Sequence, residues 1–186
     1  APVLGLTLNS WLAKLSIVIH NFIGPLFAVS VIVFFVMYVK DNLPEKNDLE
    51  WVKKGGGLLG HAPAGRFNMG EKIWFWGGVT VLGIVVSVSG LILDFPNFDQ
   101  TRLLMQQSHI IHASAALLFI VMSMGHIYIG SIGMEGALEA MRDGYVDETW
   151  AKAHHDAWYD DIKSGKVPAV RSAEGAAALG SQALVQ

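Results

Sequence analysis

The chain contains a run of 32 residues, from Leu103 to Met134, without a single Asp, Glu, Lys or Arg. A helix rises about 1.5 Å per residue, so this run is long enough to cross the roughly 30 Å hydrocarbon core of a bilayer. It carries His112 and His126, fourteen residues apart. That spacing brings both imidazoles to nearly the same side of a helix and separates them by about 21 Å along its axis. One histidine therefore falls in each leaflet.

Two further uncharged stretches accompany this one, and the predicted spans are residues 15–39, 73–93 and 108–134. Apolar residues make up 52% of the chain and charged residues 16%. So little polar sequence cannot cover three buried apolar helices in a soluble protein. The sequence therefore predicts an all-α integral membrane protein with three transmembrane helices.

The basic residues predict the orientation of these spans. Six lie in the loop 40–72 and five in the tail after Met134, whereas the segment 1–14 and the loop 94–107 hold one each. Basic residues concentrate on the cytoplasmic side of a membrane. We expect the loop 40–72 and the C-terminal tail in the cytoplasm, with 1–14 and 94–107 on the opposite face.

A third histidine, His20, lies in the first span at a depth that matches His112. Imidazole is a strong axial ligand for haem iron, and two rings at one depth on neighbouring helices can bind one iron from opposite sides. His126 then provides half of a second site. The chain has no cysteine, so covalent haem attachment and iron–sulfur ligation are excluded. The pattern indicates a b-type cytochrome, although a lone membrane histidine can also bond a serine or a carbonyl of a neighbouring helix.

Asn68 and Gly70 lie in the loop just before the second span. An amide side chain and exposed backbone amides can donate to a quinone carbonyl, but Asn-x-Gly is also an ordinary turn and N-cap sequence. His61, in the same loop, is either a surface residue or a proton carrier. His109, one turn before His112, is interpreted as an interfacial polar group.

Beyond the membrane, residues 135–163 are predicted to form a helical tail that is broken at Gly144 and ends in an amphipathic piece over 147–163. His154 and His155 are interpreted as solvent-side or capping groups. The Gly/Ala/Ser-rich segment 164–186 is expected to be disordered.

Four stretches resemble the cytochrome b (gamma) subunit of membrane-bound respiratory formate dehydrogenase: residues 20–24, 66–72, 112–126 and 143–159. The last, with Trp150-Ala-Lys-Ala-His-His155 at its centre, separates this family from the related cytochromes of nickel–iron hydrogenases and thiosulfate reductases. Those proteins share only the histidine-bearing helices.

The resemblance implies two b haems, of which one is fully ligated by this chain. His20 and His112 match the axial ligands of the haem nearer the periplasm. His126 matches one ligand of the cytoplasm-side haem, and Asn68 and Gly70 match the quinone pocket beside it.

The same resemblance implies partners and a location. The chain would be the membrane subunit of a formate:quinone oxidoreductase in the bacterial inner membrane. Formate would be oxidised in a molybdenum- or tungsten-containing alpha subunit, and electrons would pass through an iron–sulfur beta subunit to this chain and to quinone. Nucleic acid is excluded as a partner, since the net charge is −3 and no dense basic patch exists.

The chain departs from the family in one respect, since members have four transmembrane helices and the first supplies the second ligand opposite His126. We expect that an N-terminal segment is missing, which would complete a four-helix bundle; alternatively another residue such as His61 is the ligand. A cytochrome of a hydrogenase or thiosulfate-reductase-type complex, and a haem-free membrane anchor, remain as other interpretations. A metal-ion carrier is disfavoured because no predicted span carries Asp or Glu.

Overall fold

A computed structural model describes residues 5–169, which fall into two compact units. Within the described residues, the first unit consists of 5–43 and 70–135 and the second of 44–69 and 136–169. Residues 5–169 contain helices and turns and no strand, which confirms the predicted all-α class.

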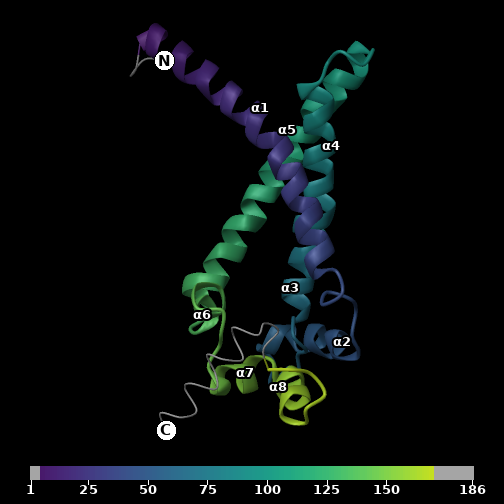
Figure 1. Cartoon of the computed structure of the whole chain (residues 1–186), viewed down its shortest axis with the longest axis vertical. Coiled ribbons are helices and arrows are strands. Elements are labelled where there is room, and N and C mark those ends of the chain that lie inside the picture. Colours follow the sequence, from purple (N-terminus) through teal and green to yellow (C-terminus); the bar gives the residue numbers. More distant parts are fainter. Residues whose placement is uncertain (1–4, 170–186) are drawn as a thin grey trace. The chain divides into compact units, whose positions relative to one another are not determined.

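The first unit contains three long helices (Figure 1). Each is long and apolar enough to cross a membrane, as expected for a multi-pass membrane protein. The first is α1, the second is continuous through α3, η2 and α4, and the third joins α5 to η3. Their bounds are Gly5–Tyr38 for α1, Met69–Ile73 for α3, Trp74–Leu82 for η2, Gly83–Asp94 for α4, Arg102–Tyr128 for α5 and Ile129–Gly133 for η3.

All three helices extend beyond the predicted spans at their N-terminal ends. α1 begins at Gly5 rather than at residue 15, because the intervening sequence carries only one charge, on Lys14, and nothing that breaks a helix. α5 begins at Arg102 because Thr101 caps it, its hydroxyl oxygen accepting from the backbone N–H of Leu104 at 3.1 Å.

α4 packs against both α1 and α5 and so holds the three helices together. At its contact with α1, a Cβ atom added to Gly83 would lie 3.2 Å from both methyl groups of Val31. Away from these contacts the apolar side chains are open, as with Phe22, which is 75% exposed. Such outward apolar faces suit a hydrocarbon solvent.

Two stretches of these helices, η2 and η3, are π-helical. Within η2 the Thr80 hydroxyl donates to the Phe75 carbonyl, five residues earlier, at 2.9 Å. π-Helical turns are rare and frequently occur near functional sites. Here η2 begins at Trp74 and η3 follows His126 within three residues.

The second unit is built from short helices. The predicted amphipathic piece over 147–163 is divided into α7 and α8, because His155 leaves the helical region at φ −141° and ψ 50°. Of the segment expected to be disordered, residues 164–169 form a turn and 170–186 lie outside the described residues. The elements of this unit are α2 (Lys46–Lys53), η1 (Gly55–Gly57), α6 (Ala137–Arg142), α7 (Glu148–His154) and α8 (Asp156–Lys163).

We expect Gly83→Leu to destabilise the first unit, since the new side chain would force α1 away from α4. Overpacking of this kind typically costs about 1–3 kcal/mol. Gly125→Leu is the matched control, because nothing lies within 4 Å of a Cβ at that position. Thermal unfolding in detergent should show a lower midpoint for Gly83→Leu than for Gly125→Leu. Equal midpoints would contradict this packing.

Candidate functional site

The first unit brings His20 of α1 and His112 of α5 face to face. Their ring centroids lie 5.9 Å apart, with the ring planes tilted by 58°. The two residues are 92 positions apart in the sequence, so this meeting depends on how α1 and α5 cross.

The separation of these rings suits a shared metal. An imidazole nitrogen binds a metal at about 2.0–2.1 Å, so two rings on opposite sides of one ion have centroids roughly 6.3 Å apart. The observed 5.9 Å is close to that value. Two neutral imidazoles are also the donor set of a six-coordinate haem iron. The residues present therefore fit an axial pair.

α4 sets the orientation of the His112 ring. Nδ1 of His112 lies 3.0 Å from the Val86 carbonyl oxygen and 3.1 Å from the Ser89 hydroxyl. A carbonyl only accepts, so Nδ1 carries the proton and donates, which leaves Nε2 with a free lone pair. This arrangement is the usual support for a metal-binding histidine.

Gly90 makes room for the same ring. A Cβ atom at this position would lie 2.9 Å from Cε1 of His112, closer than real Cβ contacts. Small residues in a membrane helix ordinarily serve helix–helix packing. Ser89 and Gly90 instead contact the ring of His112, which no signal in the sequence distinguished.

His126 has a different environment. Its ring stacks on the indole of Trp74 in η2, with centroids 4.9 Å apart and planes only 15° from parallel. Gly78 leaves the space that the Trp74 ring occupies. Among the described residues no second histidine ring contacts His126. The aromatic stack has no signal in the sequence, because a Trp near the end of a membrane span is typical of an interfacial anchor. His109 is exposed, as expected for an interfacial group.

Asn68 and Gly70 lie on either side of Met69, the first residue of α3. They are therefore within one helical turn of each other at the start of the second membrane helix. Both are partly exposed.

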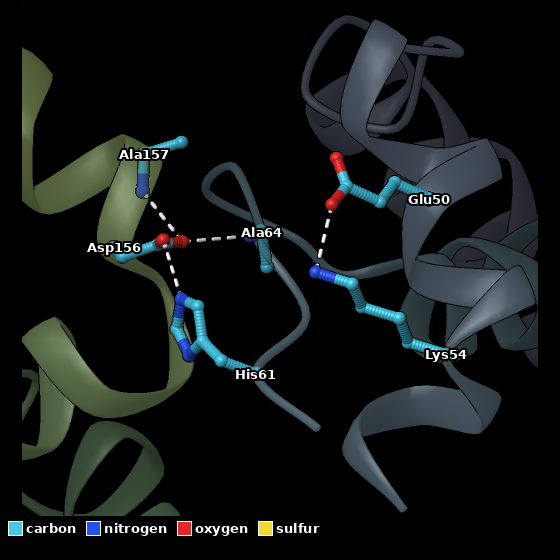
Figure 2. A network of polar contacts seen from close by, with 6 residues as sticks. All are labelled: Glu50, Lys54, His61, Ala64, Asp156 and Ala157. Atoms are coloured by element: carbon cyan, nitrogen blue, oxygen red, sulfur yellow. Dashed lines mark hydrogen bonds and ion pairs between the residues drawn. The ribbon is translucent and has the colours of Figure 1, made fainter. Parts of the chain in front are cut away.

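In the second unit, His61 and Asp156 form an ion pair at 2.7 Å between Nε2 and Oδ2 (Figure 2). The other carboxylate oxygen of Asp156 accepts from the backbone N–H groups of Ala64 (2.9 Å) and Ala157 (2.8 Å). This contact engages only Nε2 of His61, so the alternative that His61 is a haem ligand stays a prediction.

His154 is exposed, as predicted for a solvent-side group, whereas His155, the N-cap residue of α8, is not. His155 is buried, 4% exposed, and its Nδ1 lies 2.9 Å from the Gly65 carbonyl oxygen. His154 packs against Trp150 with ring centroids 5.0 Å apart. Burial and the neighbouring His155 lower the pKa of His154.

Comparison with known families identifies the class of protein that carries this arrangement. The family of prokaryotic cytochrome b561 matches residues 3–144, most of the chain. The chain belongs to this family.

Particular relatives are cytochrome subunits of formate dehydrogenases, which confirms the resemblance seen in the sequence. The formate dehydrogenase cytochrome b556(fdo) subunit of Escherichia coli K12 is 31% identical over 155 residues, 81% of this chain and 72% of the relative. The nitrate-inducible cytochrome b556(Fdn) subunit of the same strain is 30% identical over 156 residues, 80% of this chain and 71% of the relative. The cytochrome b556 subunit of Haemophilus influenzae is 30% identical over 148 residues, 76% of this chain and 61% of the relative.

We expect the contact between Asp156 and residues 61–64 to weaken in acid. Burial raises the pKa of Asp156, but hydrogen bonds from His61, Ala64 and Ala157 outweigh it and the pKa is lowered below 3.8. Because the pKa of the Asp156 carboxyl is lower in the folded chain than in the unfolded one, the ionised carboxylate stabilises the fold above pH 3.8. That stabilisation is lost as the pH falls through the pKa of Asp156 in the folded chain.

Hydrogen-exchange protection of the Ala64 amide should therefore stay constant between pH 7 and pH 5 and decrease below pH 3.8. Asp156→Asn, which has no titrating group, should lack that acid step. Protection that is unchanged through this range in the native chain would contradict the pairing.

Proposed function

We propose that this chain is the dihaem cytochrome b subunit of a formate dehydrogenase complex, and that it carries electrons across the membrane to quinone. The observation that carries this proposal is the His20–His112 pair, 5.9 Å apart on two membrane helices. Haem b supplies one-electron chemistry, since its iron alternates between the ferric and ferrous states. The protein positions that chemistry and keeps it away from water.

His20 and His112 would hold the first haem by their ring nitrogens. The Val86 carbonyl and the Ser89 hydroxyl contact Nδ1 of His112, so Nε2 would be left to bind the iron, and a hydrogen bond from Nδ1 would make the ring a stronger donor. Gly90 lets the ring lie close to α4. Every part of this support comes from one helical stretch, residues 86–90.

His126 would supply one ligand of the second haem, about 21 Å along the same helix. Trp74 stacks on its ring and fixes its plane. Among the described residues of the first unit, no second histidine ring contacts it, so this unit would supply one of the two ligands. Two haems at this spacing would divide one long electron transfer across the bilayer into shorter steps.

Asn68 and Gly70 would bind quinone at the start of the second membrane helix, through the Asn68 side-chain amide and the backbone at Gly70. The excess of Lys and Arg in the loop 40–72 supports a cytoplasmic location in the inner membrane for this site. Quinone reduction there would take up protons from the cytoplasm.

The names of the relatives support the partners that we propose. Formate would be oxidised in a molybdenum- or tungsten-containing subunit, and an iron–sulfur subunit would pass the electrons to the His20–His112 haem. This chain has no cysteine with which to hold such a cluster itself.

A haem-free membrane anchor is the second candidate, and haem content separates it from the first. We expect haem in the detergent-purified complex, measured by pyridine haemochrome and counted per chain. His20→Ala and His112→Ala should each lose one haem because the remaining imidazole cannot hold the iron alone. His126→Ala should lose the other.

His109→Ala is the matched control, because His109 is exposed on the same helix one turn before His112. It should retain the full haem content. Absence of haem from the native complex would refute the cytochrome assignment. Equal haem in His112→Ala and His109→Ala would refute the ligand assignment.

Ser89→Ala should raise the reduction potential of the haem bound at His112. Without the hydroxyl, Nδ1 keeps only the Val86 carbonyl, so the ring donates less strongly and the ferric state loses stabilisation. We expect a rise of at most about 59 mV, the change for a tenfold shift in a one-electron equilibrium. Ser87→Ala, on the same helix, should leave the potential unchanged in a spectroelectrochemical titration. A lowered potential in Ser89→Ala would contradict this role.

A further inference from the structure

We propose that His155 and Asp156 are positioning residues for the quinone site, because they hydrogen-bond the loop 61–65 that leads to Asn68. We call this set of contacts the clamp. This inference rests on the proposed role of Asn68 in quinone binding. Neither residue touches quinone or haem in the proposed function. Their role follows from contacts within the second unit alone.

Ala64 both donates hydrogen bonds to α8 and accepts them from it, and Figure 2 shows the bond that its N–H donates to Asp156. The backbone N–H of Ala64 donates to Asp156 Oδ1 at 2.9 Å. Its carbonyl oxygen in turn accepts from the N–H groups of Ala157 (3.1 Å) and Trp158 (3.4 Å). These are first-turn N–H groups of α8, which have no backbone partner within their own helix. The loop therefore caps α8 while the carboxylate of α8 holds the loop.

His155 extends the clamp by one residue. Its Nδ1 lies 2.9 Å from the carbonyl oxygen of Gly65, and the contact is buried. On the other side of Gly65 the Glu45 carboxylate fills the space that a Cβ atom would take. Gly65 thus contacts side chains from two distant parts of the chain, and a Cβ atom there would require the Glu45 carboxylate to move.

His61, at the start of the loop 61–65, makes the remaining contact with Asp156. Its ion pair with Asp156 spans 95 positions of sequence, and its side chain is 59% exposed. An exposed pair contributes little energy by itself. The buried backbone contacts of Ala64, which is 2% exposed, are the stronger part of the clamp.

The connection to Asn68 is short. Gly65 and Asn68 are three positions apart, so the chain between them spans at most about 10 Å. On the far side, Met69 begins α3 and fixes the chain again. Asn68 therefore lies on a brief connection between two anchored points, and release of the first point removes one restraint on its backbone.

The test compares Asp156→Ala and Asp156→Asn in the intact formate dehydrogenase complex. Asp161→Asn is the matched control, since Asp161 lies on the same helix and pairs only with the neighbouring Lys166 at 2.9 Å. Two readouts are needed: hydrogen exchange of residues 62–68, and KM and kcat for a water-soluble quinone. Haem content reports that the membrane unit is intact.

We expect Asp156→Ala to speed exchange in residues 62–68 and to raise the KM for quinone with little change in kcat. If the loop is in its binding conformation one tenth of the time, the apparent affinity falls about tenfold. Asp156→Asn retains an acceptor for the Ala64 N–H, so it should give a smaller rise. Asp161→Asn should match the native complex in both readouts.

Unchanged exchange in both Asp156 variants would show that no clamp exists. Faster exchange with an unchanged KM would show that the clamp does not position the site. If Asp156→Ala fails to assemble, Asp156→Asn decides by the same two readouts. Asn68→Ala separates this inference from the proposed function. If the KM for quinone in Asn68→Ala equals that of the native complex, the quinone site itself is wrong. If Asn68→Ala raises the KM but Asp156→Ala does not, only the clamp is wrong.

Discussion

The placement of polar imidazoles inside a hydrocarbon core is the constraint on which the rest of this structure depends. An unpaired polar group is costly there, and water is not available to satisfy it. His112 meets this requirement through Val86 and Ser89 on α4, which take one ring nitrogen and leave the other for a ligand. The hydrogen bond thus stabilises the fold and prepares the site at once.

The packing of the three helices follows the same logic. α4 is the helix that contacts both others, and its small residues lie where close approach is needed. Gly83 admits Val31 of α1, and Gly90 admits the ring of His112. These contacts bring α1 and α5 near enough for His20 and His112 to face one another. α4 therefore sets the distance between His20 of α1 and His112 of α5, although neither residue belongs to α4.

Much of this arrangement could be predicted from the sequence. Long uncharged runs define the membrane helices, and the matching depths of His20 and His112 predict that their rings meet. Other features left no signal. Ser89 is an ordinary membrane-helix residue, and the acceptor on Val86 is a backbone carbonyl, which every residue has. Trp74 near a span end is typical of an interfacial anchor, so the sequence did not indicate its stack on His126.

The second unit shows a further limit. Asp156 and Ala64 are 92 positions apart, and neither belongs to a motif that predicts their contact. The break at His155, which divides the tail into α7 and α8, arises because the N-terminal N–H groups of α8 turn toward the Ala64 carbonyl. Tertiary hydrogen bonds of this kind override the local helical pattern, so the sequence predicted one amphipathic piece where there are two.

We propose that His20 and His112 share one haem iron. Near-infrared magnetic circular dichroism of the oxidised complex is the decisive measurement, because the charge-transfer band of a low-spin ferric haem identifies the axial pair. We predict the band of bis-histidine ligation, with the component from this haem lost in His20→Ala. A spectrum of histidine–methionine ligation, or one unchanged in His20→Ala, would contradict the account.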